Sequence, residues 1–163
     1  LNEICKTAKI SKPGLYREFG GEDGLMRSIL TNYEKKILQP NLKMLESDRP
    51  FRNSLEDLIS FVTNMDDSQN NPKGCLLVKM RESQLALGKE TQMQINNAKR
   101  YGLKKYENWI EGSRAKGEFT TTISSQFAAV YIDAQVSSAL SQLARGEKNS
   151  EVKKILQMAF SVF

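Results

Sequence analysis

The spacing of the apolar residues constrains the fold of this chain most strongly. Apolar side chains recur every three or four residues through almost the whole length, and no segment of useful length alternates apolar and polar residues as a half-buried strand does. One stripe consists of Leu55, Leu58, Ile59, Val62 and Met65, which all fall on one face of a single helix. The sequence therefore predicts an all-α protein.

Four more helices are expected downstream. Their apolar stripes place them over residues 77–87, 91–117, 125–145 and 150–163. A turn-rich stretch separates the first of them from the helix before it. Gly117 is expected to end the longest helix, because glycine readily adopts the left-handed conformation that closes a helix.

The composition excludes several classes of chemistry. The chain of 163 residues contains no histidine, which excludes Ser–His–Asp and Cys–His catalysis and ordinary zinc sites. Its two cysteines, Cys5 and Cys75, form neither a disulfide framework nor a CxxC motif, so a reducing cytoplasm is the expected compartment. The longest aliphatic run covers only residues 75–78, far short of a membrane span. We expect a cytoplasmic protein with no membrane segment, no cofactor and no metal.

The first 45 residues are expected to form shorter helices. A helix over residues 1–9 is followed by another over 11–19, in which Ser11 is a suitable N-cap and Pro13 is tolerated in the first turn. The glycines at 20–21 are expected to stop the second helix.

A longer helix follows this pair. It begins with the acidic residues Glu22 and Asp23, which suit the positive end of a helix dipole, and Pro40 is expected to end or kink it. Two short helices joined by a tight turn and braced by a third describe a helix-turn-helix.

The stretch LNEICKTAKISKPGLYREFGGEDGLMRSIL, residues 1–30, resembles the DNA-binding head of the tetracycline-repressor (TetR) family. The matching residues are Ile4, Ala8, Ser11, Gly14, Leu15, Tyr16, Phe19 and Leu25. Residues 74–78, GCLLV, are also similar to a helix start in one branch of that family. Members usually carry one more helix before this point, so we expect further residues ahead of Leu1.

The resemblance implies that the helix over 11–19 is a recognition helix. Such a helix enters the major groove by its N-terminal end, so Lys12 is expected to face base edges, where it can donate to guanine O6 and N7. Tyr16 and Arg17 lie one turn further on and are expected to reach phosphates. The predicted DNA-binding residues are Lys9, Ser11, Lys12, Pro13, Gly14, Tyr16 and Arg17. The plain alternative is a helical hairpin with a solvated basic edge.

One residue departs from the family pattern. Members commonly carry a lysine at the third position after the closing phenylalanine, where it meets a DNA phosphate, and this chain has Glu22 there. Residues 1–19 nevertheless hold four basic and two acidic side chains, and the whole chain has a net charge of +5. We expect a head that binds double-stranded DNA with one phosphate contact fewer.

The body is rich in aromatic and methionine side chains, which suit an apolar ligand cavity between helices. The resemblance favours such a cavity, because bodies in the TetR family usually hold a small-molecule pocket. The predicted pocket residues are Phe61, Met65, Met80, Tyr101, Tyr106, Trp109, Phe127 and Tyr131. The alternative is that most of them are ordinary core residues.

The last two helices are expected to form a subunit interface. The helix over 125–145 is apolar on two sides and therefore needs two partners, and small residues along it would let another helix approach closely. In the TetR family these helices form a four-helix bundle in a two-fold dimer. The predicted interface residues are Ala134, Ser137, Ser138, Ser141, Ile155, Leu156, Ala159 and Phe160. The alternative is a monomer that buries both faces itself.

These features predict a helix-turn-helix head with its connecting helix over 1–45 and a ligand-binding and dimerisation body over 46–163. The expected function is a ligand-responsive transcriptional regulator, a repressor that binds a palindromic operator as a homodimer and is released by a small apolar effector. The alternative is a helical small-molecule binding or scaffold protein that has lost sequence-specific DNA binding. An all-α enzyme has least support, because no catalytic signature is present.

Cys75 lies near two lysines, which would suit a redox sensor, but a buried structural cysteine is the favoured interpretation.

Overall fold

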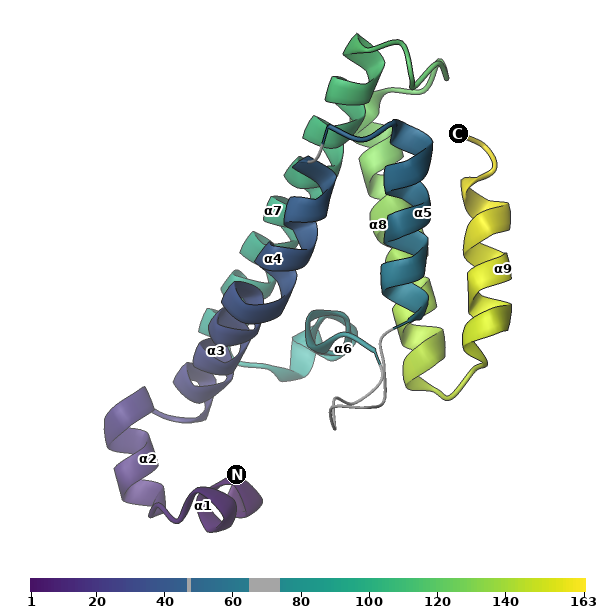
Figure 1. The fold of residues 1–163 in the computed structure, drawn as a ribbon. Coiled ribbons are helices and arrows are strands. Elements are labelled where there is room, and N and C mark those ends of the chain that lie inside the picture. Colours follow the sequence, from purple (N-terminus) through teal and green to yellow (C-terminus); the bar gives the residue numbers. More distant parts are fainter. Residues whose placement is uncertain (47, 65–73) are drawn as a thin grey trace.

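The computed structural model describes residues 1–46, 48–64 and 74–163, and its regular structure in these ranges is entirely helical (Figure 1). The elements are α1 (Asn2–Ala8), α2 (Lys12–Phe19), α3 (Glu22–Tyr33), η1 (Glu34–Leu38), α4 (Gln39–Leu42), η2 (Lys43–Glu46), α5 (Phe51–Thr63), α6 (Leu76–Glu82), η4 (Gln84–Ala86), α7 (Lys89–Ala115), α8 (Ser125–Ala144) and α9 (Asn149–Phe160). The predicted all-α class is confirmed. Over the same residues, no helix combines the length and the apolar character that crossing a bilayer requires.

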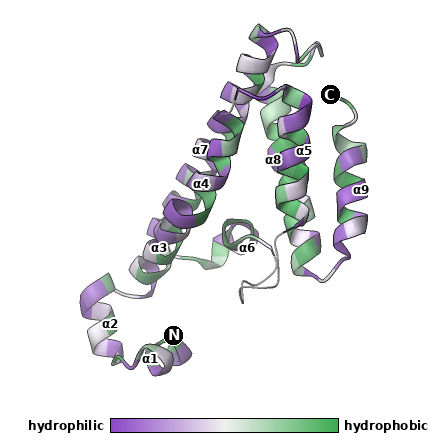
Figure 2. Ribbon diagram, in the orientation of Figure 1, coloured by the Kyte–Doolittle hydropathy of each residue, from purple (hydrophilic) through white to green (hydrophobic). Residues whose placement is uncertain are grey.

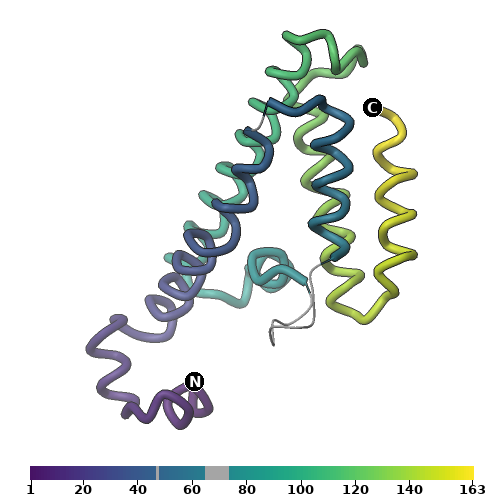
Figure 3. Tube along the Cα trace, viewed as in Figure 1, coloured from purple at the N-terminus to yellow at the C-terminus, as the bar shows by residue number. Residues whose placement is uncertain are grey.

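The helices form two packed groups, with one helix between them and a projecting pair at one end. Figure 1 shows α3, η1 and α4 as one long rod that lies beside α7, while α5, α8 and α9 pack together on the other side of the body. Helix α6 lies across the space between these two groups, and α1 and α2 project from one end of the rod. The trace in Figure 3 places the N-terminus in this projecting pair and the C-terminus at the opposite end, near the start of α5.

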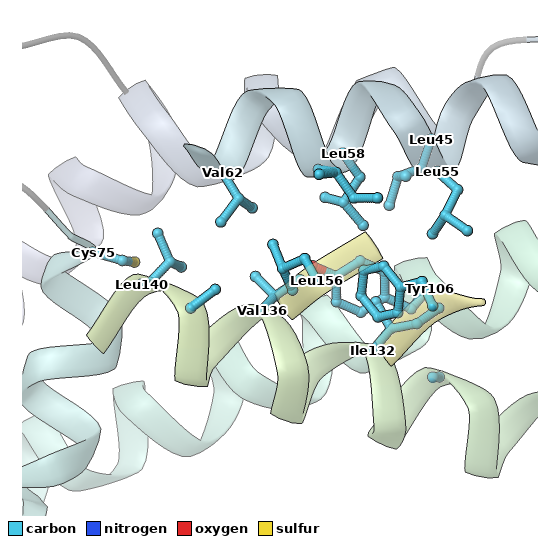
Figure 4. Close-up of a cluster of buried hydrophobic side chains, with 14 of the residues drawn as sticks. Leu45, Leu55, Leu58, Val62, Cys75, Tyr106, Ile132, Val136, Leu140 and Leu156 are labelled. Carbon is cyan, nitrogen blue, oxygen red and sulfur yellow. The ribbon is translucent and has the colours of Figure 1, made fainter. Parts of the chain in front are cut away.

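The core lies where α5, α7, α8 and α9 meet. Figure 4 shows aliphatic side chains of α5, among them Leu58 and Val62, opposite Ile132, Val136 and Leu140 of α8. Helix α8 packs against α5, α7 and α9, and it is hydrophobic along most of its length in Figure 2 because it has neighbours on several sides.

An aromatic cluster closes the end of the body near the C-terminus. The Phe51 ring stacks on Trp109 at a centroid distance of 4.7 Å and meets the edges of Phe119 at 5.1 Å and Phe163 at 6.2 Å. The backbone N–H of Phe51 donates to Glu118 Oε2 at 2.8 Å, which satisfies a donor in the first turn of α5. The cluster fixes the start of α5 against the end of α7.

Of the two outcomes expected at Pro40, an end or a kink of the helix, the structure excludes the end. This residue does not end the helix, because α3 passes into the π-helical turn η1 and the rod continues through α4 and η2. In η1 the Gln39 N–H donates to Glu34 O, five residues back. A regular α-helix would bring the proline ring against the carbonyl four residues earlier, and the wider turn immediately before Pro40 relieves that clash.

The other boundaries follow the sequence more closely. Gly20 (φ 73°) ends α2 and Gly117 (φ 75°) follows α7, both in the left-handed conformation. The helix expected over 77–87 is shorter than predicted, since α6 ends at Glu82 and a short 3-10 turn follows. There the Ser83 hydroxyl donates to the Lys79 carbonyl at 3.1 Å, which competes with continued helix pairing.

Candidate functional site

The projecting pair α1 and α2 has helix-turn-helix geometry. Lys9 takes the left-handed conformation (φ 54°) in the turn, and Ser11 caps α2 by accepting a hydrogen bond from the Gly14 N–H at 3.2 Å. Leu15 is 1% exposed and is the buried side chain of α2. Phe19, four residues further along α2, is half-buried.

The residues predicted to bind DNA lie together around this turn and along α2. All except the half-buried Gly14 are exposed. Lys9, Lys12 and Arg17 form no ion pair with any residue that the structure describes, so their charges are free to meet an external anion. Tyr16 presents its ring to solvent, 45% exposed.

The start of α3 carries two acidic residues with different surroundings. Glu22 is exposed in the first turn. Asp23 instead caps α7: its carboxylate accepts hydrogen bonds at 3.0 Å from the backbone N–H groups of Glu90 and Thr91, and at 2.5 Å from the Thr91 hydroxyl. The hydrogen bond from the Thr91 side chain, followed by those from the two backbone groups, lowers the pKa of Asp23. The start of the rod is thereby attached to the start of α7.

A glycine holds the head against the rod. A Cβ atom on Gly24 would lie 1.8 Å from the carbonyl oxygen of Phe19, the last residue of α2. Because no side chain fits there, α2 and α3 approach each other more closely than any other residue would permit.

A cavity of about 110 Å³ lies in the body, between the rod and helices α5, α6, α7 and α8. Its wall is largely apolar and includes Leu42, Leu58, Phe61 and Val136. The π-helical turn η1 also lines it, and such turns occur often at functional sites. A largely apolar cavity with few polar groups is typical of a small-molecule site.

The polar groups of the wall cluster around α6 and α8. The Arg81 guanidinium donates to both carboxylate oxygens of Asp133, at 3.1 and 3.3 Å, and to the Ser137 hydroxyl at 3.2 Å. Nearby, the Tyr33 hydroxyl donates to Cys75 Sγ at 3.5 Å. Cys75 is buried, 5% exposed, as the structural interpretation expected.

Burial changes the acid–base behaviour of three groups in this wall. It raises the pKa of Tyr33 and of Tyr106, so both phenols keep their protons at neutral pH. It also raises the pKa of Glu34, whose carboxylate accepts a hydrogen bond from Gln94 Nε2 at 2.9 Å. The wall therefore offers hydroxyl donors and one neutralised ion pair.

The predicted pocket residues divide between several places. Phe61, Tyr101 and Tyr106 line the cavity. The others that the structure describes lie elsewhere: Met80 is core, Trp109 stacks in the aromatic cluster, Phe127 is 61% exposed, and Tyr131 donates through its hydroxyl to Ala159 O at 2.9 Å. Met65 falls outside the described residues.

Solved structures of other proteins share the fold of this chain at low sequence identity. No family model and no curated protein sequence matches the chain. Among solved structures, the reduced form of E. coli NemR aligns with a TM-score of 0.85 and 18% identity, over 99% of this chain and 84% of that one. A CifR cysteine mutant, described as a TetR family transcriptional regulator in complex with a 26 bp operator DNA, aligns with a TM-score of 0.82 and 16% identity, over 100% and 85% of the two chains. The chain has a TetR-like fold.

Within this TetR-like fold, the residues predicted for a subunit interface are only partly accessible. Leu156 and Phe160 are buried in the core of the chain itself, 1% and 2% exposed, so they are not available to a partner. Ser137 bonds Arg81 at the cavity, and Ser141 donates to Glu82 Oε1 at 2.5 Å. The rest are Ala134, Ser138 and Ile155, which are exposed, and Ala159, which is half-buried.

Other exposed apolar residues, which the predicted interface set does not include, lie on α8, on α9 and in the turn after α9. Val130 of α8 is 49% exposed, while Met158 and Val162 at the end of the chain are 73% and 59% exposed. They share with Phe127 and Ile155 an apolar character that solvent does not favour. In the sequence, each of these residues is recognisable only as an apolar residue outside the main stripe. That pattern does not show whether another helix of the same chain or a partner covers the side chain.

Proposed function

We propose that this protein is a ligand-responsive transcriptional regulator, a repressor that binds a palindromic operator as a homodimer and is released by a small, largely apolar effector. One observation carries the proposal: the rod that begins at the helix-turn-helix head also lines a largely apolar cavity. The likeness to CifR, a TetR family regulator solved in complex with operator DNA, supports the DNA-binding part.

The proposed route from cavity to head runs through two connections. The rod passes along the cavity at η1 and α4 and reaches the head through the close contact of Gly24 with Phe19. The Asp23 cap attaches the same end of the rod to α7, which forms another wall. A ligand that binds better to one separation of these walls favours one head position, and the coupling cannot exceed its difference in affinity for the two states.

The proposed dimer uses the exposed apolar residues of α8 and α9. Phe127, Val130 and Ala134 lie on one side of α8, and Ile155 and Met158 are exposed on α9. Two-fold dimers are the commonest assembly and place two recognition helices in successive major grooves, about 34–36 Å apart.

The test is selection of a random duplex pool by the full-length protein, followed by fluorescence anisotropy of the winning sequences over a range of salt. We expect a palindrome whose affinity falls steeply with salt, because phosphate contacts release counterions. Lys12→Ala should relax the preference at one base position, whereas Tyr16→Phe should weaken all sequences alike. Lys79→Ala, which removes an exposed lysine of α6, is the charge-matched control and should change neither the base preference nor the overall affinity.

A second candidate, a helical ligand-binding protein that does not read DNA, is favoured by the exposed acid Glu22 at the place where a phosphate contact is expected. Selection that enriches no sequence, with ligand binding intact, would establish this second function and reject the first.

A further inference from the structure

Tyr106 is the least explained polar residue of the cavity. Its side chain is 6% exposed and lines the cavity wall, yet its hydroxyl makes no hydrogen bond with any residue that the structure describes. Buried polar groups are nearly always paired, so an unpaired one calls for a partner from outside the chain. Within the described ranges, two side-chain oxygens have neither a hydrogen-bond partner nor accessible surface, Ser54 Oγ and Thr121 Oγ1. Tyr106 Oη is not among them, so its unpaired hydroxyl has accessible surface.

Two polar groups near Tyr106, those of Asp133 and Cys75, accept hydrogen bonds from other residues. Asp133 is close enough to raise the pKa of Tyr106, but its two oxygens accept from Arg81. Cys75 accepts from Tyr33. The Tyr106 hydroxyl therefore lines the cavity without a hydrogen bond to either of these two neighbours.

The charges of the wall favour a neutral ligand. The Arg81 charge is balanced by Asp133, and Glu34 adds a second acid whose charged form burial disfavours. An anion would face two carboxylates, with the exposed Lys99 as the other basic residue of the wall. A cation would face Arg81 at the polar end.

The volume limits the size of the ligand. A dry apolar cavity of ~150 Å³ admits benzene. At about 110 Å³, this cavity holds a molecule of about one small ring unless its walls move apart.

We propose that the cavity takes a neutral molecule of about one small ring, apolar except for one carbonyl or ether oxygen, and that Tyr106 donates a hydrogen bond to that oxygen. The proposal deepens the proposed function, because it names the chemical class of the effector for the same cavity.

The experiment compares two isosteric probes, cyclopentanone and methylenecyclopentane, which differ in a carbonyl oxygen against a methylene group. Dissociation constants are measured by protein NMR titration without DNA, for the wild type and for Tyr106→Phe. We expect Tyr106→Phe to weaken cyclopentanone about fivefold, the equivalent of ~1 kcal/mol for one net hydrogen bond, and to leave methylenecyclopentane unchanged. Tyr131→Phe removes a hydroxyl that lies outside the cavity, where it donates to Ala159 O, and as the matched control it should change neither dissociation constant.

Three results would overturn the proposal: no binding of cyclopentanone to the wild type, equal changes for both probes in Tyr106→Phe, or tighter binding of the charged probes isobutyrate or cyclopentylammonium. The thermal midpoint of Tyr106→Phe should equal or exceed that of the wild type, since the removed hydroxyl has no partner in the described chain. The titrations contain no DNA, so the two proposals can fail separately. A selection that enriches no operator rejects the transcriptional regulator and leaves the proposed ligand class standing. A titration that shows no binding of cyclopentanone rejects the ligand class and leaves the regulator standing.

Discussion

The ion pair between Arg81 and Asp133 should contribute measurably to the free energy of unfolding, whereas most solvent-exposed ion pairs contribute little. The closest oxygen lies 3.1 Å from Arg81 Nη2, and the side chains are only 22% and 18% exposed. At an effective dielectric of about 20, two unit charges 3.1 Å apart attract each other by about 5 kcal/mol. Water at the exposed part of each side chain screens this attraction, so we expect a pairwise coupling of about 2 kcal/mol.

The measurement is a double-mutant cycle with Arg81→Met, Asp133→Asn and the double variant. Each is unfolded in urea and followed by far-UV circular dichroism at one fixed protein concentration, because self-association would add to the apparent stability. Asp133→Asn alone should cost about 2–3 kcal/mol, since it leaves a largely buried guanidinium without a counter-charge. The double variant should cost about 2 kcal/mol less than the sum of the single variants.

The exposed pair Arg27 and Glu90 provides the comparison. Its atoms lie 3.4 Å apart, but the side chains are 51% and 59% exposed, so the same cycle should give less than about 0.5 kcal/mol. If the cavity pair couples no more strongly than this exposed pair, then water reaches Arg81 freely, and the low polarity assigned to the cavity is refuted.

Four further outcomes follow from single positions. Glu22→Lys should tighten operator binding and increase the salt slope of its logarithm by about 1, measured by anisotropy, because it adds a phosphate contact. Phe51→Ala should lower the free energy of unfolding in urea by about 3–5 kcal/mol, because a 1% exposed ring leaves the aromatic cluster; no loss would mean that the cluster is not packed. The raised pKa of Glu34 means that the folded state holds its proton more tightly than the unfolded state, so wild-type stability should fall, relative to Glu34→Gln, as pH rises from about 4.5; a flat difference contradicts the burial of Glu34. Gly24→Ala should reduce operator affinity while far-UV circular dichroism still shows a helical body, because its Cβ would strike Phe19 O at the joint of head and rod.

The sequence predicts the helices well because their signal is local. The apolar stripe of α5, the Ser11 cap and the glycines after α2 and α7 each act within a few residues, and the structure has all of them. A helix end at Pro40, one of the two outcomes expected there, was wrong, because the effect of a proline depends on the hydrogen-bond pattern of the preceding turn, which proline itself does not specify.

The cavity could not be read from the sequence in the same way. Arg81 and Asp133 stand 52 positions apart, and nothing local indicates that α6 and α8 bring them together. Whether an aromatic residue lines a cavity or packs in the core depends on the gap between neighbouring helices, so Tyr106 and Trp109 look alike in the sequence although only Tyr106 lines the cavity. The same ambiguity affects α9, where Leu156 and Met158 are both apolar and only Leu156 is buried.

The π-helical turn also sets the direction in which the head faces. An α-helix rotates by about 100° per residue, so the number of residues between the head and the cavity acts as a phase angle. If the same five residues of Glu34–Leu38 paired as a regular α-helix, the head would turn by about this angle relative to the cavity wall. Deleting one of them as the turn becomes α-helical would leave the phase almost unchanged, because a π turn contains about one residue more than an α turn. Replacing a surface side chain of the rod leaves the phase unchanged. In the proposed dimer, the alignment of the two heads on one operator therefore depends on the π-helical pairing of this segment together with its length.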